Sequence, residues 1–97
     1  MKLTNKALED FDLWFEDKYF NNMNFYYTKP TIFNALIVEW FDSVGIYVSI
    51  NYCSISEGFE CKVKAKNFNY CDGIHDRIEA TTQAILTANK LYNEKRN

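Results

Sequence analysis

Two runs of strictly alternating residues occupy the middle of the chain, between Ile46 and Lys66. A period of two is typical of a half-buried antiparallel hairpin. The apolar positions are Ile46, Val48, Ile50 and Tyr52 in the first run, and Phe59, Cys61, Val63 and Ala65 in the second. The pattern therefore predicts a hairpin with one face toward a core and one face toward solvent.

The segment between the two runs, Ile55 to Gly58, is the predicted loop and fixes a predicted register. On the apolar face the predicted pairs are Tyr52 with Cys61, Ile50 with Val63, and Val48 with Ala65. On the other face Asn51, Ser49 and Tyr47 are opposite Lys62, Lys64 and Lys66. This register predicts a row of three lysines on the solvent face.

Segments whose apolar residues recur at helical spacing lie on both sides of the hairpin in the sequence. Thr4 is the predicted N-cap of a helix over about residues 5–20, where apolar residues recur at intervals of three and four. Pro30 suits the first turn of a second helix, which Gly45 is placed to end. Phe68 to Tyr70 makes a short third strand. A last helix reaches about Lys95, with Asp72 as its predicted cap, Asp76 as the alternative, and an apolar stripe of Ile74, Ile78, Thr81, Ile85, Ala88 and Tyr92.

These elements predict one domain over residues 1–97 with an α+β fold. The order is α-α-β-β-β-α, and the sheet is a three-stranded antiparallel meander. A sheet with one wet face needs the helices packed on its other face. Aromatic residues make up 18% of the chain, so large rings compensate for its short length in building a core.

Charge divides the chain into two unlike halves. The net charge of −2 lacks the basic excess that general nucleic-acid or membrane-surface binders show. Residues 1–45 hold seven acids and four lysines, whereas residues 46–97 hold six acids and seven bases. The acidic excess lies mainly on the polar face of the first predicted helix.

The candidate reactive groups are few and have ordinary structural explanations. Cys53, Cys61 and Cys71 form an odd set without CxxC spacing, which fits free thiols in a reducing cytoplasm. Cys71 precedes a predicted helix start near His75, the single histidine, so a reactive thiol is an alternative to a structural one. A metal site needs three or four converging ligands, and we expect neither a metal nor another cofactor. No apolar run is long enough to span a bilayer. We also expect no enzymatic activity.

Two surfaces are candidates for binding. The first combines carboxylates of the first helix with nearby aromatic residues, and its candidate residues are Asp10, Asp12, Trp14, Glu16, Asp17, Tyr26 and Tyr27. Such an acidic surface can compete for a basic surface that normally holds nucleic acid. The second is the lysine face of the hairpin, where Tyr47, Lys62, Lys64 and Lys66 can contact phosphates.

The segment Ile37 to Ile46, with its Phe-Asp-Ser-Val-Gly-Ile corner between helix and strand, carries a family resemblance. Together with the hairpin and the long last helix, it resembles small accessory proteins of phages and prophages from AT-rich bacteria, anti-CRISPR proteins among them. The resemblance covers roughly residues 31–95 and leaves out the acidic first helix. It implies inhibition by binding and transfers no functional residue.

Two hypotheses follow. In the first, the chain is a phage-derived interaction protein that binds and inhibits a defence nuclease in the host bacterial cytoplasm. A CRISPR effector, for example an RNA-cutting one of type VI, is the expected partner, and its RNA channel the expected target. In the second, the chain is an RNA-binding module that uses the lysine face. A homodimer sealed by spare aromatic residues is compatible with both.

Overall fold

Helices and strands follow one another in the predicted order. The computed structural model describes residues 3–19, 30–55, 57–74 and 76–96. Its elements are the helices α1 (Asn5–Tyr19), α3 (Pro30–Ser43) and α4 (Arg77–Arg96), and the strands β1 (Tyr47–Cys53), β2 (Gly58–Ala65) and β3 (Phe68–Ile74). The order is α-α-β-β-β-α, which confirms the predicted α+β fold.

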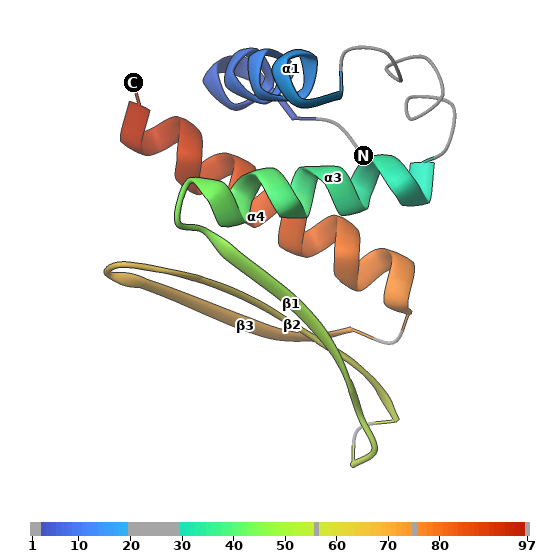
Figure 1. The fold of residues 1–97 in the computed structure, drawn as a ribbon. Helices are drawn as coiled ribbons and strands as arrows, with labels where there is room; N and C mark the ends of the chain where they lie inside the picture. The colour runs from blue at the N-terminus through green and yellow to red at the C-terminus, as the bar shows by residue number, and fades with distance from the viewer. Residues whose placement is uncertain (1–2, 20–29, 56, 75, 97) are drawn as a thin grey trace.

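The elements form three layers (Figure 1). The antiparallel sheet has the strand order β1-β2-β3 and forms the first layer. Helices α3 and α4 cover one face of the sheet, and α1 lies across them on the side away from the sheet. No helix or strand of the described residues covers the other face of the sheet, as the alternating pattern predicts.

The predicted register of the hairpin is wrong by two residues. Val48 pairs with Val63, Ile50 with Cys61, and Tyr52 with Phe59. The turn lies one residue earlier than predicted, because Gly58 begins β2 opposite Cys53, and Glu57 adopts the positive φ of 55°. A shift of two residues leaves every side chain on its predicted face, since side chains alternate with a period of two.

Helix α3 ends where Gly45 was expected to end it. The amide of Ile46 donates to the carbonyl of Phe41 at 2.9 Å, and the amide of Gly45 donates to the carbonyl of Asp42 at 3.2 Å. These two bonds form a Schellman motif, which requires a left-handed residue. Gly45 supplies it with a φ of +82°, so the chain turns directly into β1.

The start of α4 differs from the favoured prediction. Asp76 is the cap, because its Oδ1 accepts the amide of Ile78 at 2.7 Å. Asp72 lies in β3 opposite Cys61. The third strand is therefore longer than predicted, and Ile78, placed in the buried stripe by the sequence, is 74% exposed.

Aromatic residues join the two helical layers. Trp40 of α3 is buried between Phe11 of α1, with ring centroids 5.9 Å apart, and Tyr92 of α4, at 4.9 Å. Val63 and Cys61 extend the core to the sheet. The large apolar area of such rings stabilises a core built from few residues.

Two buried asparagines of α4 hold the start of α1. The side-chain oxygen of Asn93 accepts the Ala7 amide at 2.8 Å, and that of Asn89 accepts the Thr4 amide at 3.0 Å. Their NH₂ groups donate in turn to Thr4, Asn89 to Oγ1 at 3.0 Å and Asn93 to the carbonyl at 3.0 Å. Thr4 precedes the helix as predicted, but Asn93 satisfies the amide that an N-cap side chain usually bonds.

Replacing Gly45 by alanine tests the role of the left-handed turn between α3 and β1. Gly45→Ala lowers the free energy of unfolding by about 1 kcal/mol, because a Cβ is disfavoured at positive φ. No atom lies within 4 Å of the added Cβ, so the cost comes from backbone conformation and not from a clash. Urea unfolding followed by circular dichroism measures it.

Gly73→Ala is the matched control. Its added Cβ also meets no atom within 4 Å, and Gly73 has no left-handed φ. We expect it to change the free energy of unfolding by less than about 0.5 kcal/mol. Equal effects of the two substitutions would contradict the explanation.

Candidate interaction surfaces

The solvent face of α1 is acidic. Ala7, Phe11 and Phe15 recur every fourth residue and are buried against α3 and α4, which turns the opposite side of the helix outward. Exposed residues of this outward side include Glu9, Asp12, Leu13, Glu16 and Asp17, here named the acidic face, and the ammonium of Lys6 lies 3.7 Å from the Glu9 carboxylate. Leu13 is 65% exposed among the four carboxylates, so the face also offers an apolar contact.

Asp10 and Trp14 lie at the border of this face and help to hold the fold. The Asp10 carboxylate accepts a hydrogen bond from the Tyr92 hydroxyl of α4 and lies 3.4 Å from the Lys6 ammonium. Trp14 is half-buried, with its ring 5.9 Å from that of Phe11 and 5.2 Å from the Lys18 nitrogen. The expectation that Trp14 is an exposed anchor therefore needs correction, because one side of its ring packs against the core.

The other two aromatic candidates, Tyr26 and Tyr27, lie outside the described residues. Of the seven residues proposed from sequence for partner binding, Asp12, Glu16 and Asp17 share the exposed face of α1. Leu13 and Glu9 were missed, although the helical period places them between those carboxylates. The acidic face is thus more compact than the set predicted from sequence.

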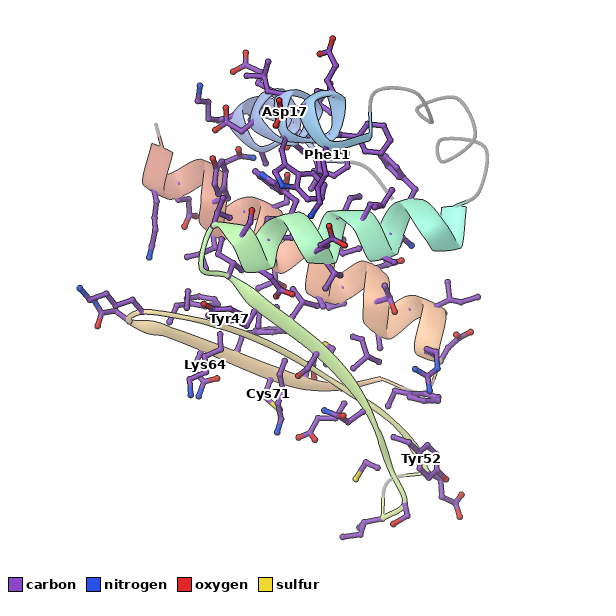
Figure 2. The ribbon with its side chains drawn as sticks, viewed as in Figure 1. Phe11, Asp17, Tyr47, Tyr52, Lys64 and Cys71 are labelled. Atoms are coloured by element: carbon purple, nitrogen blue, oxygen red, sulfur yellow. The ribbon has the colours of Figure 1, made fainter. Side chains whose placement is uncertain are left out.

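The uncovered face of the sheet carries Tyr47 and Lys64 (Figure 2). Lys62 is exposed and, two residues before Lys64 on the same strand, belongs to the same face. Tyr47 is 56% exposed and lies opposite Lys64, not opposite Lys66 as predicted. Lys62 lies opposite Ser49, and its nitrogen is 3.9 Å from the Glu60 carboxylate. Two lysines and a tyrosine therefore share this face, with one carboxylate among them.

Lys66 is not part of the strand row. It follows the end of β2 in the turn toward β3, and together with Lys95 of α4 and Gly45 it lines a hollow at the edge of the sheet. The prediction of three lysines in one straight row is wrong, because the strand ends at Ala65. The positive charge on the uncovered face is correspondingly smaller.

The exposed thiol of Cys71 lies on the same face and is held in its protonated form. Cys71 Sγ donates to Glu60 Oε1 at 3.1 Å. This hydrogen bond to a carboxylate is the main cause that raises the pKa of Cys71 above that of an ordinary cysteine thiol, and desolvation adds to it. A protonated thiol is a poor nucleophile, so the geometry disfavours the reactive-thiol alternative.

Three further features were considered from the sequence: a role for His75, a metal site and a membrane-spanning helix. His75 lies outside the described residues. Within the described ranges, no three His, Cys, Asp or Glu side chains come close enough to hold a metal ion. No helix in that same part of the chain is both long and apolar enough to cross a membrane.

A third surface was missed entirely by sequence reasoning. At the far end of the hairpin Tyr52 is 60% exposed and stacks edge to face on Phe59, with ring centroids 5.5 Å apart. The Arg77 guanidinium of α4 lies 4.6 Å from the centre of the Phe59 ring. The alternating pattern placed Tyr52 in the core, whereas the hairpin extends past the helices that would cover it (Figure 1).

Removing the Glu60 charge tests the state of the Cys71 thiol. Glu60→Gln lowers the pKa of Cys71, so alkylation by iodoacetamide at pH 8 becomes about two- to threefold faster. Peptide mass spectrometry measures the rate at Cys71 separately from the other cysteines. Glu57→Gln, an exposed change in the hairpin loop, should leave the rate unchanged. A Cys71 rate that does not respond to Glu60→Gln would show that the thiol does not depend on this carboxylate.

Comparison with protein-family models, with curated proteins and with solved structures found no significant match. Among the described residues, the acidic face of α1 brings four exposed carboxylates and the exposed Leu13 together on one helix.

Proposed function

We propose that the chain is a non-enzymatic binding protein that inhibits a bacterial defence nuclease, as the anti-CRISPR proteins that it resembles in sequence do. The acidic face of α1 is the proposed contact, and the RNA channel of a type VI CRISPR effector is the proposed target. The observation that carries this proposal is the set of four exposed carboxylates around Leu13 on one side of one helix.

The charge of α1 explains how such a contact would work. The helix contains five carboxylates and two lysines, which gives it a net charge of −3. Channels that hold RNA are lined by Lys and Arg, so a rigid row of carboxylates competes there with phosphates. Electrostatic attraction speeds the encounter, and burial of Leu13 slows dissociation.

Binding fits the exposed chemistry better than catalysis does. The exposed Cys71 thiol has a raised pKa, and the carboxylates of the acidic face are all exposed on one helix, so no difference in burial separates their environments. Acting inside the host bacterial cytoplasm agrees with the free thiols Cys53, Cys61 and Cys71.

A second candidate function is RNA binding by the uncovered sheet face. Tyr47 offers an exposed ring for stacking directly opposite Lys64, with Lys62 two residues away on the same strand. Because Lys62 lies close to Glu60, this face attracts phosphates more weakly than three aligned lysines would. We therefore place inhibition through α1 first.

Charge reversal on α1 tests the first proposal. The triple variant Asp12→Lys, Glu16→Lys, Asp17→Lys should weaken binding to a type VI effector loaded with its guide RNA by at least about 100-fold, since each charge contact at an interface contributes on the order of 1 kcal/mol or more. The measurements are co-precipitation after nuclease treatment and cleavage of a fluorescent reporter RNA by the effector.

The matched control reverses three exposed acids elsewhere, in the variant Glu57→Lys, Glu79→Lys, Glu94→Lys. It changes the net charge equally, so it should still inhibit. If both triple variants inhibit like the wild type, the acidic face is not the contact. If the wild type inhibits nothing but binds labelled RNA, and Lys62→Glu with Lys64→Glu abolishes that binding, the RNA-binding function replaces the first proposal.

A further inference from the structure

The outer edge of β1 is a strand edge without the usual protection. β1 stands at one end of the order β1-β2-β3, and no strand in the described part of the chain pairs with its outer side. Exposed edges are normally blocked by charged residues, proline or bulges. The seven residues Tyr47 to Cys53 include no charged residue and no proline. The edge can therefore accept another strand.

An apolar hollow of about 480 Å³ lies beside this edge. Ala35 and Val38 of α3, Ile50 of β1 and Ile78 of α4 line it, with polar groups of Asn34, Arg77 and Thr81 at its rim. The guanidinium of Arg77 also lies 4.6 Å from the centre of the Phe59 ring, so the pair of Tyr52 and Phe59 neighbours a residue that lines the hollow. Since residues of α3 and α4 line it together with Ile50, the hollow lies on the helix-covered side of β1, the side to which Val48, Ile50 and Tyr52 belong.

We propose that a second copy of this chain occupies this site, with its β1 strand paired antiparallel to the first. In a two-fold register centred on Ile50, Ile50 meets Ile50 of the second copy, Val48 meets Tyr52, and Ser49 meets Asn51. The two three-stranded sheets then form one continuous sheet of six strands. Such an isologous contact closes on itself and leaves neither β1 edge open.

The chemistry of β1 favours its own copy as the occupant. Because the strand is uncharged, the two-fold axis brings no like charges together, although each chain has a net charge of −2. A new strand on the edge satisfies backbone groups, and its apolar residues on the helix-covered side are presented to the hollow beside Ile50. Ile50 lines the hollow of its own chain, and Val48, Ile50 and Tyr52 of the second copy are the apolar residues presented to it.

This contact is independent of the proposed function. Helix α1 lies on the far side of α3 and α4 from the sheet (Figure 1), so pairing through β1 leaves both acidic faces exposed. A dimer would present two of them. Failure of the dimer would leave the inhibition proposal standing, and failure of inhibition would leave the dimer standing.

Charge substitution at the two-fold axis is the test. Wild-type protein at about 100 μM should sediment at twice the monomer mass in analytical ultracentrifugation. Ile50→Lys and Ile50→Glu should each weaken the dimer by at least about tenfold, since equal charges meet across the axis. Mixing the two variants should restore a heterodimer, because Lys then meets Glu.

Control variants separate the effect of the proposed strand pairing from the general effect of an added charge. Leu86→Lys, at a half-exposed leucine of α4 away from β1, should dimerise like the wild type. Circular dichroism checks that each variant folds. If the Ile50 variants unfold, Tyr52→Lys replaces them, since Tyr52 is already largely exposed and faces Val48 across the axis. The proposal is overturned if the wild type is a monomer, or if Tyr52→Lys dimerises as strongly as the wild type. It is also overturned if Ile50→Lys and Ile50→Glu are both folded but stay monomeric when mixed.

Discussion

The structure depends on how α4 is held between two layers. One side of this helix packs on the sheet, and the other carries α1, so α4 needs buried residues around much of its girth. Ala80, Ala84 and Ala88 are fully buried and small enough for close packing. On the side of α1 the contact is polar, because Asn89 and Asn93 bond the backbone of Thr4 and Ala7. Buried amides of this kind fix orientation, since misplacing them leaves polar groups unsatisfied.

This anchoring decides which surfaces of the protein a partner can reach. With the start of α1 fixed by Asn93, and its apolar side packed on Trp40, the acidic face of α1 lies on the side of the helix away from α3 and α4. The sheet edge at β1 lies in the opposite layer. A contact through the acidic face and a contact through β1 can therefore exist at the same time, and a β1-paired dimer would present the acidic face twice.

Periodicity predicted the parts of this structure that are determined locally. It assigned Val48, Val63 and Cys61 to the core side, and the left-handed turn at Gly45 was predictable because few residues other than glycine adopt it readily. It also placed Asp12, Glu16 and Asp17 on one exposed helix face. The register of the hairpin was not predictable, because two registers that differ by two residues have the same inward and outward faces.

Features that depend on tertiary contacts escaped sequence reasoning. Nothing in the local pattern tells how far the helices extend over the sheet, so Tyr52 and Ile78 were assigned to the core although both are exposed. The role of Asn93 depends on a residue 89 positions away. The most direct test of this anchor is the free energy of unfolding of Asn93→Ala, with Asn69→Ala, at an exposed asparagine, as control. We expect a loss of about 2–3 kcal/mol for Asn93→Ala and less than about 0.5 kcal/mol for Asn69→Ala. Equal values for the two would contradict the claim that Asn93 anchors α1.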